Sequence, residues 1–180
     1  MSITLILGGA RSGKSRYAQE LAGELGRKVL YVATAEALDD EMKDRIEAHR
    51  RTRPESWKTV EAARDVAAAI LDEVADADVV IIDCLTLLLT NIADEDTGVE
   101  LWEKRAAGEL DRIVALADGS AARFIVVSNE VGLGLVPAYP LGRGFRDVVG
   151  WANQMLARRA SEVYFMVAGI PIPLKKEGDA

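Results

Sequence analysis

A run near the amino terminus combines glycines, a lysine and a hydroxyl residue at the spacing of a phosphate-binding loop. Gly8–Ser15 reads GGARSGKS and fits G-x-x-x-x-G-K-[ST] at every defined position. The glycines let backbone N–H groups turn toward phosphate oxygens, and the start of the following helix adds positive potential. We expect Lys14 to reach the β- and γ-phosphates of a nucleoside triphosphate, and the Ser15 hydroxyl to ligate Mg²⁺. The predicted nucleotide contacts are Gly8, Gly9, Ala10, Arg11, Ser12, Gly13, Lys14 and Ser15.

Asp83 is a candidate for a second Mg²⁺ ligand because it ends an aliphatic run, Val79–Ile82. An acidic residue at the end of a buried strand is the usual partner of a phosphate loop in holding the metal. The same carboxylate could instead cap the following segment, 84–89. The presence of the phosphate loop favours the metal role.

The one histidine, His49, lies in the most basic stretch of the chain, Lys43–Arg53. A neutral imidazole can act as a nucleophile or a base near pH 7, and nearby arginines would neutralise a phosphoryl group under attack. However, His49 shares a helical face with Met42 and Ile46, which is also typical of a partly buried structural histidine. The residue pattern alone leaves both interpretations open.

Strands that alternate with helices must position these residues. Apolar runs predict strands at 3–7, 29–34, 79–83, 124–128 and 163–167. Apolar spacing predicts helices at 14–25, from Asp39 to Arg53, at 66–74, 99–117 and 145–160, with loops at 94–98 and in the glycine- and proline-rich stretch 132–144. This alternation predicts an α/β fold with a mostly parallel sheet and helices on both faces, as a single domain over residues 1–180.

Composition excludes several classes of function. The 180 residues carry a net charge of −7, which argues against binding nucleic acid. No apolar run approaches the ~20 residues that would span a bilayer, so we expect no membrane insertion. A single cysteine, Cys84, cannot form an internal disulfide and fits a cytoplasmic location, and no signal peptide is visible.

Two GTPase signatures are missing. Asp83 is followed by Cys84, Leu85 and Thr86, without the glycine of D-x-x-G, and Asn129–Gly132 lacks the lysine of N-K-x-D. These differences argue against a regulatory GTPase.

Beyond the phosphate loop, longer segments resemble one enzyme family over nearly the whole chain. They are LYVAT (30–34), LDDEMKDRIEAHRRTRPESWKTVEA (38–62), DCLTLLLTN (83–91), SNEVGLGLVP (128–137), LGRGFRDVVGWANQ (141–154) and VAGIP (167–171). The chain resembles the bifunctional adenosylcobinamide kinase/adenosylcobinamide-phosphate guanylyltransferases of cobalamin biosynthesis. The resemblance implies a three-layer P-loop NTPase fold of the RecA-like type.

The resemblance also implies two reactions. ATP or GTP phosphorylates adenosylcobinamide, and GTP then donates GMP to that phosphate, giving adenosylcobinamide-GDP and pyrophosphate. His49 stands where the family carries GMP on a histidine, so the resemblance assigns catalysis to His49 and Lys14. Further implied nucleotide contacts are Ala33, Thr34, Ala35, Arg50, Arg51, Thr52, Arg53, Glu61 and Asp83, and the implied state is a homotrimer. Ala35 and Thr52 are the most replaceable of these contacts.

The residue pattern alone leaves some assignments undecided. Glu61 would accept hydrogen bonds from ribose or guanine, or begin the next helix. The stretch Gly132–Gly144 would cover the corrinoid. Two other functions are compatible with the phosphate loop: a small-molecule kinase without guanylyltransferase activity, in which His49 only packs, and a nucleotide-binding partner without catalysis.

Overall fold

Seven strands form one sheet in the computed structural model, which describes residues 3–37, 39–93, 98–176 and 178. The strands are β1 (Ile3–Gly8), β2 (Val29–Ala33), β3 (Lys58–Glu61), β4 (Val79–Asp83), β5 (Arg123–Val127), β6 (Glu162–Val167) and β7 (Ile170–Lys175). Their order across the sheet is β3-β2-β4-β5-β1-β6-β7. Every neighbouring pair is parallel except β6 and β7, so the expectation of a mostly parallel sheet is confirmed.

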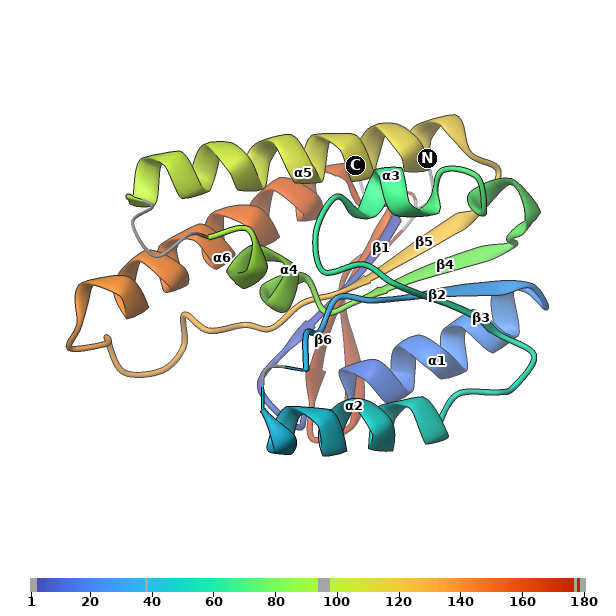
Figure 1. Cartoon of the computed structure of the whole chain (residues 1–180), viewed down its shortest axis with the longest axis horizontal. Helices are drawn as coiled ribbons and strands as arrows, with labels where there is room; N and C mark the ends of the chain where they lie inside the picture. Colours follow the sequence, from blue (N-terminus) through green and yellow to red (C-terminus); the bar gives the residue numbers. More distant parts are fainter. Residues whose placement is uncertain (1–2, 38, 94–97, 177, 179–180) are drawn as a thin grey trace.

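Helices cover both faces of this sheet. They are α1 (Lys14–Leu25), α2 (Asp40–Arg51), α3 (Val66–Ile70), α4 (Leu85–Asn91), α5 (Val99–Gly119) and α6 (Pro140–Arg159), with a short 3-10 helix, η1, at Val74–Asp76. Figure 1 shows α1 and α2 on one side of the sheet, and α3, α4, α5 and α6 on the other. The arrangement confirms the three-layer P-loop fold, and β5 lies between β1 and β4 in the sheet.

The apolar runs of the central strands reflect burial on both faces. Ile3 and Leu5 of β1 belong to a large core that α3, α5 and α6 cover, whereas Ile6 belongs to a smaller core beneath α1. All three side chains are fully buried. None of the helices that the structure describes is long and apolar enough to cross a membrane.

The sixth helix begins five residues before the predicted start at Phe145. Pro140 occupies its first turn, where a missing N–H costs nothing. Gly142 and Gly144, which the sequence analysis placed in a loop, are buried helical residues. A Cβ on Gly144 would lie 2.7 Å from Val99 Cγ2, so this glycine permits close packing of α6 against α5. The prediction of a loop there was wrong because Gly144 allows contact between helices, and Gly142 packs against Pro137 and Tyr139 in the segment before α6.

Two strands escaped prediction, and one prediction lies outside the described residues. β3 has only four residues, and three of them are exposed. β7 contains two prolines and pairs along one side with β6, an edge position that tolerates proline. The predicted helix at 66–74 is divided into α3 and η1. Of the predicted loop at 94–98, only Gly98 is described, where it precedes α5.

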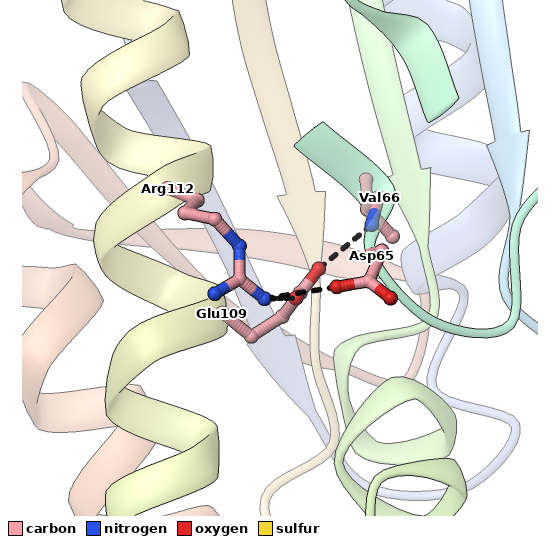
Figure 2. Close-up of polar contacts among 4 residues, drawn as sticks. All are labelled: Asp65, Val66, Glu109 and Arg112. Atoms are coloured by element: carbon pink, nitrogen blue, oxygen red, sulfur yellow. Dashed lines mark hydrogen bonds and ion pairs between the residues drawn. The ribbon is translucent and has the colours of Figure 1, made fainter. Parts of the chain in front are cut away.

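A buried carboxylate joins the third helix to the fifth. Figure 2 shows Glu109 of α5 accepting a hydrogen bond from the backbone N–H of Val66, the first residue of α3, at 2.7 Å. Arg112 also donates to Glu109, and it reaches Asp65 at 3.1 Å. Glu109 therefore satisfies a helix-terminal N–H that has no partner within α3.

Candidate active site

A cavity of about 760 Å³ lies at the carboxyl ends of the parallel strands. Binding sites in open α/β sheets commonly occupy this edge. Loops after β1, β2, β4 and β5 contribute to the wall, and α2 and α6 contribute side chains. The lining residues are Ala10, Arg11, Ser12, Gly13, Lys14, Ser15, Arg16, Ala33, Ala35, Met42, Ile46, His49, Arg53, Asp83, Cys84, Thr86, Leu87, Thr90, Val127, Asn129, Glu130, Val131 and Phe145.

The predicted phosphate loop connects β1 to α1 and forms the floor of the cavity. Gly13, at the start of α1, has φ of 96°, a left-handed conformation that favours glycine. Gly8 has φ of 153°, and a Cβ there would lie 2.7 Å from the Met166 carbonyl oxygen. Both glycines therefore shape the loop through their backbone, although Gly8 and Gly9 do not themselves line the cavity.

Lys14 is buried within this loop. Its Nζ donates a hydrogen bond to the Gly9 carbonyl oxygen at 2.6 Å, so the ammonium lies over the loop's own backbone. Burial lowers the pKa of Lys14, and the neighbouring Cys84 and Asp83 partly oppose that shift. A cation held here faces the space that the loop encloses, as phosphate binding requires.

Asp83 faces the phosphate loop and does not cap the following helix. Its Oδ1 accepts a hydrogen bond from Ser15 Oγ at 3.3 Å, and its Oδ2 accepts one from the Tyr31 hydroxyl. The residue before α4 is Cys84, and no side chain caps that helix. Burial and the adjacent Asp83 carboxylate raise the pKa of Tyr31, so its hydroxyl stays protonated and donates the hydrogen bond to Asp83. A hydroxyl and a carboxylate oxygen brought together in this way fit Mg²⁺, which prefers oxygen ligands.

His49 lies on α2 and lines the cavity together with Met42 and Ile46. Asp39 caps the start of the helix as predicted, and its Oδ1 accepts a hydrogen bond from Met42 N at 2.7 Å. The imidazole is exposed, and Met42 and Ile46 are only half-buried. The apolar face of α2 therefore borders the cavity, which is why its spacing resembled that of a core helix.

Among the arginines that end this basic stretch, Arg53 is the one that lines the cavity. Its guanidinium stacks on the Tyr31 ring at 3.7 Å from the centroid, and it lines the cavity. Arg50 and Arg51 are exposed outside the lining, and Arg51 pairs with Glu47 on α2 at 3.0 Å. Thr52 is also exposed, and its hydroxyl donates to the His49 carbonyl oxygen. The structure thus brings Arg53 to the site and leaves the other three residues on the outer surface.

The segment after β2 contributes mainly through its backbone. Ala33 and Ala35 line the cavity, whereas Thr34 is fully buried outside the lining. Thr34 Oγ1 donates to the Cys84 carbonyl oxygen and accepts from Cys84 N, each at 2.7 Å, which ties the ends of β2 and β4 together. Glu61 ends β3 beside Ala33 and is exposed, but it does not border the cavity.

The far wall of the cavity contains residues that the sequence analysis did not assign to the site. Asn129 follows β5 and donates to Thr86 Oγ1 at 2.7 Å, and Thr86 in turn contacts Cys84 Sγ at 2.8 Å. Burial raises the pKa of Cys84, so the thiol stays protonated. Glu130 lies beside Asn129 in the lining. The signal available in the sequence was SNEVG, a polar segment directly after a buried strand.

The chain is similar to known proteins over nearly its whole length. Residues 4–174 match the family described as cobinamide kinase / cobinamide phosphate guanyltransferase. The bifunctional adenosylcobalamin biosynthesis protein CobP of Pseudomonas aeruginosa is 46% identical over 173 residues, covering 96% of this chain and 97% of its own. The proteins named CobU from Escherichia coli and Salmonella typhimurium are 41% and 39% identical, each covering 95% of this chain and 98% of its own.

Proposed function

Because the chain belongs to the family of cobinamide kinases and cobinamide phosphate guanyltransferases, we propose that it performs both reactions in the cavity described above. It phosphorylates adenosylcobinamide with ATP or GTP, and then transfers GMP from GTP to adenosylcobinamide phosphate. The products are adenosylcobinamide-GDP and pyrophosphate. The observation that carries this proposal is that His49 and the phosphate loop line one cavity.

The phosphate loop holds the triphosphate in both reactions. Backbone N–H groups between Gly8 and Lys14 and the start of α1 favour negative charge at this point. Lys14 neutralises the β- and γ-phosphates, and Arg53 lies across the cavity with a buried Nε that has no hydrogen-bond partner among the described residues. Ser15 and Asp83 would hold Mg²⁺, which would neutralise phosphate charge when it is bound.

Transfer of GMP requires a nucleophile that can reach the α-phosphorus. A neutral ring nitrogen of His49 attacks that phosphorus, a P–N bond forms, and the P–O bond to pyrophosphate breaks. An oxygen of adenosylcobinamide phosphate then attacks the same phosphorus, and the P–N bond breaks to free His49. Covalent catalysis of this kind divides one difficult transfer into two easier ones.

The position of α2 supports this role. None of the side chains described on α2 is buried, so few packed contacts hold the helix against the rest of the molecule. Just after the carboxyl end of α2, Arg53 stacks on Tyr31 of β2 and so connects the helix to the sheet. Movement of α2 toward bound GTP would therefore disrupt little of the core.

Other parts of the proposal rest on the family resemblance and on features of the surface. Arg50, Arg51 and Thr52 lie outside the cavity lining and would contact nucleotide only after such a movement. Glu61 ends β3 and does not move with α2, so it would contact a part of the nucleotide that extends beyond the cavity. A homotrimer is consistent with the exposed apolar side chains Leu133, Leu135 and Leu141 near the start of α6. A cytoplasmic location is consistent with a free thiol at Cys84.

Incubation with GTP labelled at the α-phosphate tests this proposal. We expect a covalent label that is stable to alkali, labile to acid and absent from His49→Ala. The principal alternative is a small-molecule kinase in which His49 has no chemical role. Phosphorylation of adenosylcobinamide without any such label would favour that alternative and refute guanylyl transfer through His49.

A further inference from the structure

We infer that Glu130 is the catalytic base of the phosphorylation step, receiving the proton of the acceptor hydroxyl. This inference rests on the proposed kinase activity and adds a residue that contacts its second substrate. Two carboxylates occur among the described residues that line the cavity, Asp83 and Glu130. Both oxygens of Asp83 already accept hydrogen bonds, from Ser15 and from Tyr31, which commits Asp83 to the metal side of the site.

The backbone around Glu130 is attached to the phosphate loop. The N–H of Glu130 donates to the carbonyl oxygen of Gly8, the first residue of that loop, at 3.0 Å. Ser128, two residues earlier, is fully buried, and its N–H donates to Ile6 in β1. Glu130 therefore has a fixed place at the mouth of the loop, where the terminal phosphate of a bound triphosphate would lie.

The other polar residues of the SNEVG segment have structural partners. Ser128 Oγ donates to Asn153 Oδ1 at 2.6 Å, and Asn153 Nδ2 donates to the Asn129 carbonyl oxygen at 3.1 Å. The Asn129 side chain donates to Thr86. Of these three residues, Asn129 and Glu130 line the cavity, and Glu130 is the one whose side chain can take a proton.

The conformation after Glu130 orients its carboxylate. Oε1 accepts a hydrogen bond from the N–H of Gly132, and the Gly132 carbonyl oxygen accepts one from Arg146 on α6. One carboxylate oxygen is thereby fixed, and Oε2 is left to receive a hydrogen bond from an alcohol. A carboxylate that accepts the hydroxyl proton is the common arrangement in kinases.

Phosphorylation of the hydroxyl releases one proton and one nucleoside diphosphate. Glu130 takes the proton of the acceptor hydroxyl as its oxygen forms a bond to the γ-phosphorus. The bond from that phosphorus to the β,γ-bridging oxygen breaks, and the electron pair leaves with the nucleoside diphosphate. Glu130 then releases the proton to solvent. Guanylyl transfer has no such proton to remove, because its acceptor is a phosphate oxygen.

The test is Glu130→Gln, which retains an oxygen acceptor for Gly132 but cannot take a proton. We expect kcat for phosphorylation of adenosylcobinamide to fall about 100-fold or more, with KM for ATP changed less than about threefold. Labelling by GTP and guanylyl transfer to supplied adenosylcobinamide phosphate should stay within about threefold of wild type, which also shows that the variant folds. Glu130→Asp should retain more kinase activity than Glu130→Gln, and Glu100→Gln, an exposed exchange on α5, should match wild type.

An undiminished kinase rate in Glu130→Gln would overturn the inference, and so would an equal loss of both activities, which would indicate a structural role. Absence of both activities in the wild-type protein would overturn the proposed function itself. Kinase activity in wild type that survives in Glu130→Gln would leave the proposed function intact and refute only the role of Glu130.

Discussion

The contact between Glu109 and the start of α3 gives a stability prediction whose size follows from the structure (Figure 2). Glu109 is 1% exposed, and Val66, whose N–H donates to it, is fully buried. In Glu109→Ala this buried N–H loses its acceptor, which costs about 1–3 kcal/mol. The hydrogen bond from Arg112 is also lost, but it adds less because the Arg112 side chain is 53% exposed.

We therefore expect Glu109→Ala to lower the free energy of unfolding by about 1–4 kcal/mol. For a chain of this length each kcal/mol changes Tm by roughly 2–4 °C, so the decrease should lie between about 2 and 16 °C. Glu109→Gln keeps an oxygen for Val66 and should cost about half as much. Urea unfolding and thermal melting would measure both changes.

Asp65 provides the matched control for this prediction. It pairs with the same Arg112, but its side chain is 74% exposed, so Asp65→Asn should cost no more than about 0.5 kcal/mol. Asparagine also tolerates the left-handed backbone at this position, where φ is 48°. Equal losses in Asp65→Asn and Glu109→Ala would refute the reasoning, because burial would then not determine the cost.

Three further predictions concern the nucleotide site. Lys14→Ala should abolish both phosphorylation and guanylyl transfer, since both use the same phosphate loop; full labelling of this variant by GTP would contradict a shared site. Tyr31→Phe keeps the ring beneath Arg53 but removes the hydroxyl that orients Asp83. The Mg²⁺ concentration needed for half-maximal kinase activity should therefore rise severalfold. An unchanged Mg²⁺ titration would be evidence against a role of Tyr31 in orienting Asp83. Gly8→Ala would place a Cβ 2.7 Å from the Met166 carbonyl oxygen, so nucleotide affinity measured by calorimetry should fall at least tenfold; wild-type affinity would show that the loop can adjust.

Much of the fold could be predicted because local signals and tertiary structure agree. α1 has the predicted bounds, 14–25, since it starts within the phosphate loop and stops at Gly26. β4 was recognisable because both of its faces are buried, which requires an uninterrupted aliphatic run. β7 was not recognisable, because its prolines contradict strand propensity and are tolerated only by the edge position.

The site was harder to predict, because spacing along a helix does not reveal what the helix faces. His49 shares a face with Met42 and Ile46, and only the tertiary structure shows that this face borders a cavity. The same basic stretch includes Arg53, which stacks on Tyr31, and Arg50, which is exposed. Glu130 was missed for a different reason: its relation to Gly8 depends on β5 pairing with β1, a contact between distant parts of the chain.

The most direct test of the whole account is a crystal structure with GTP and Mg²⁺ bound. We predict the triphosphate in the phosphate loop and a ring nitrogen of His49 either bonded to the α-phosphorus or within about 3.5 Å of it, in line with the pyrophosphate oxygen. GTP seated in the loop with the imidazole still directed to solvent, in crystals whose protein turns over, would contradict the account.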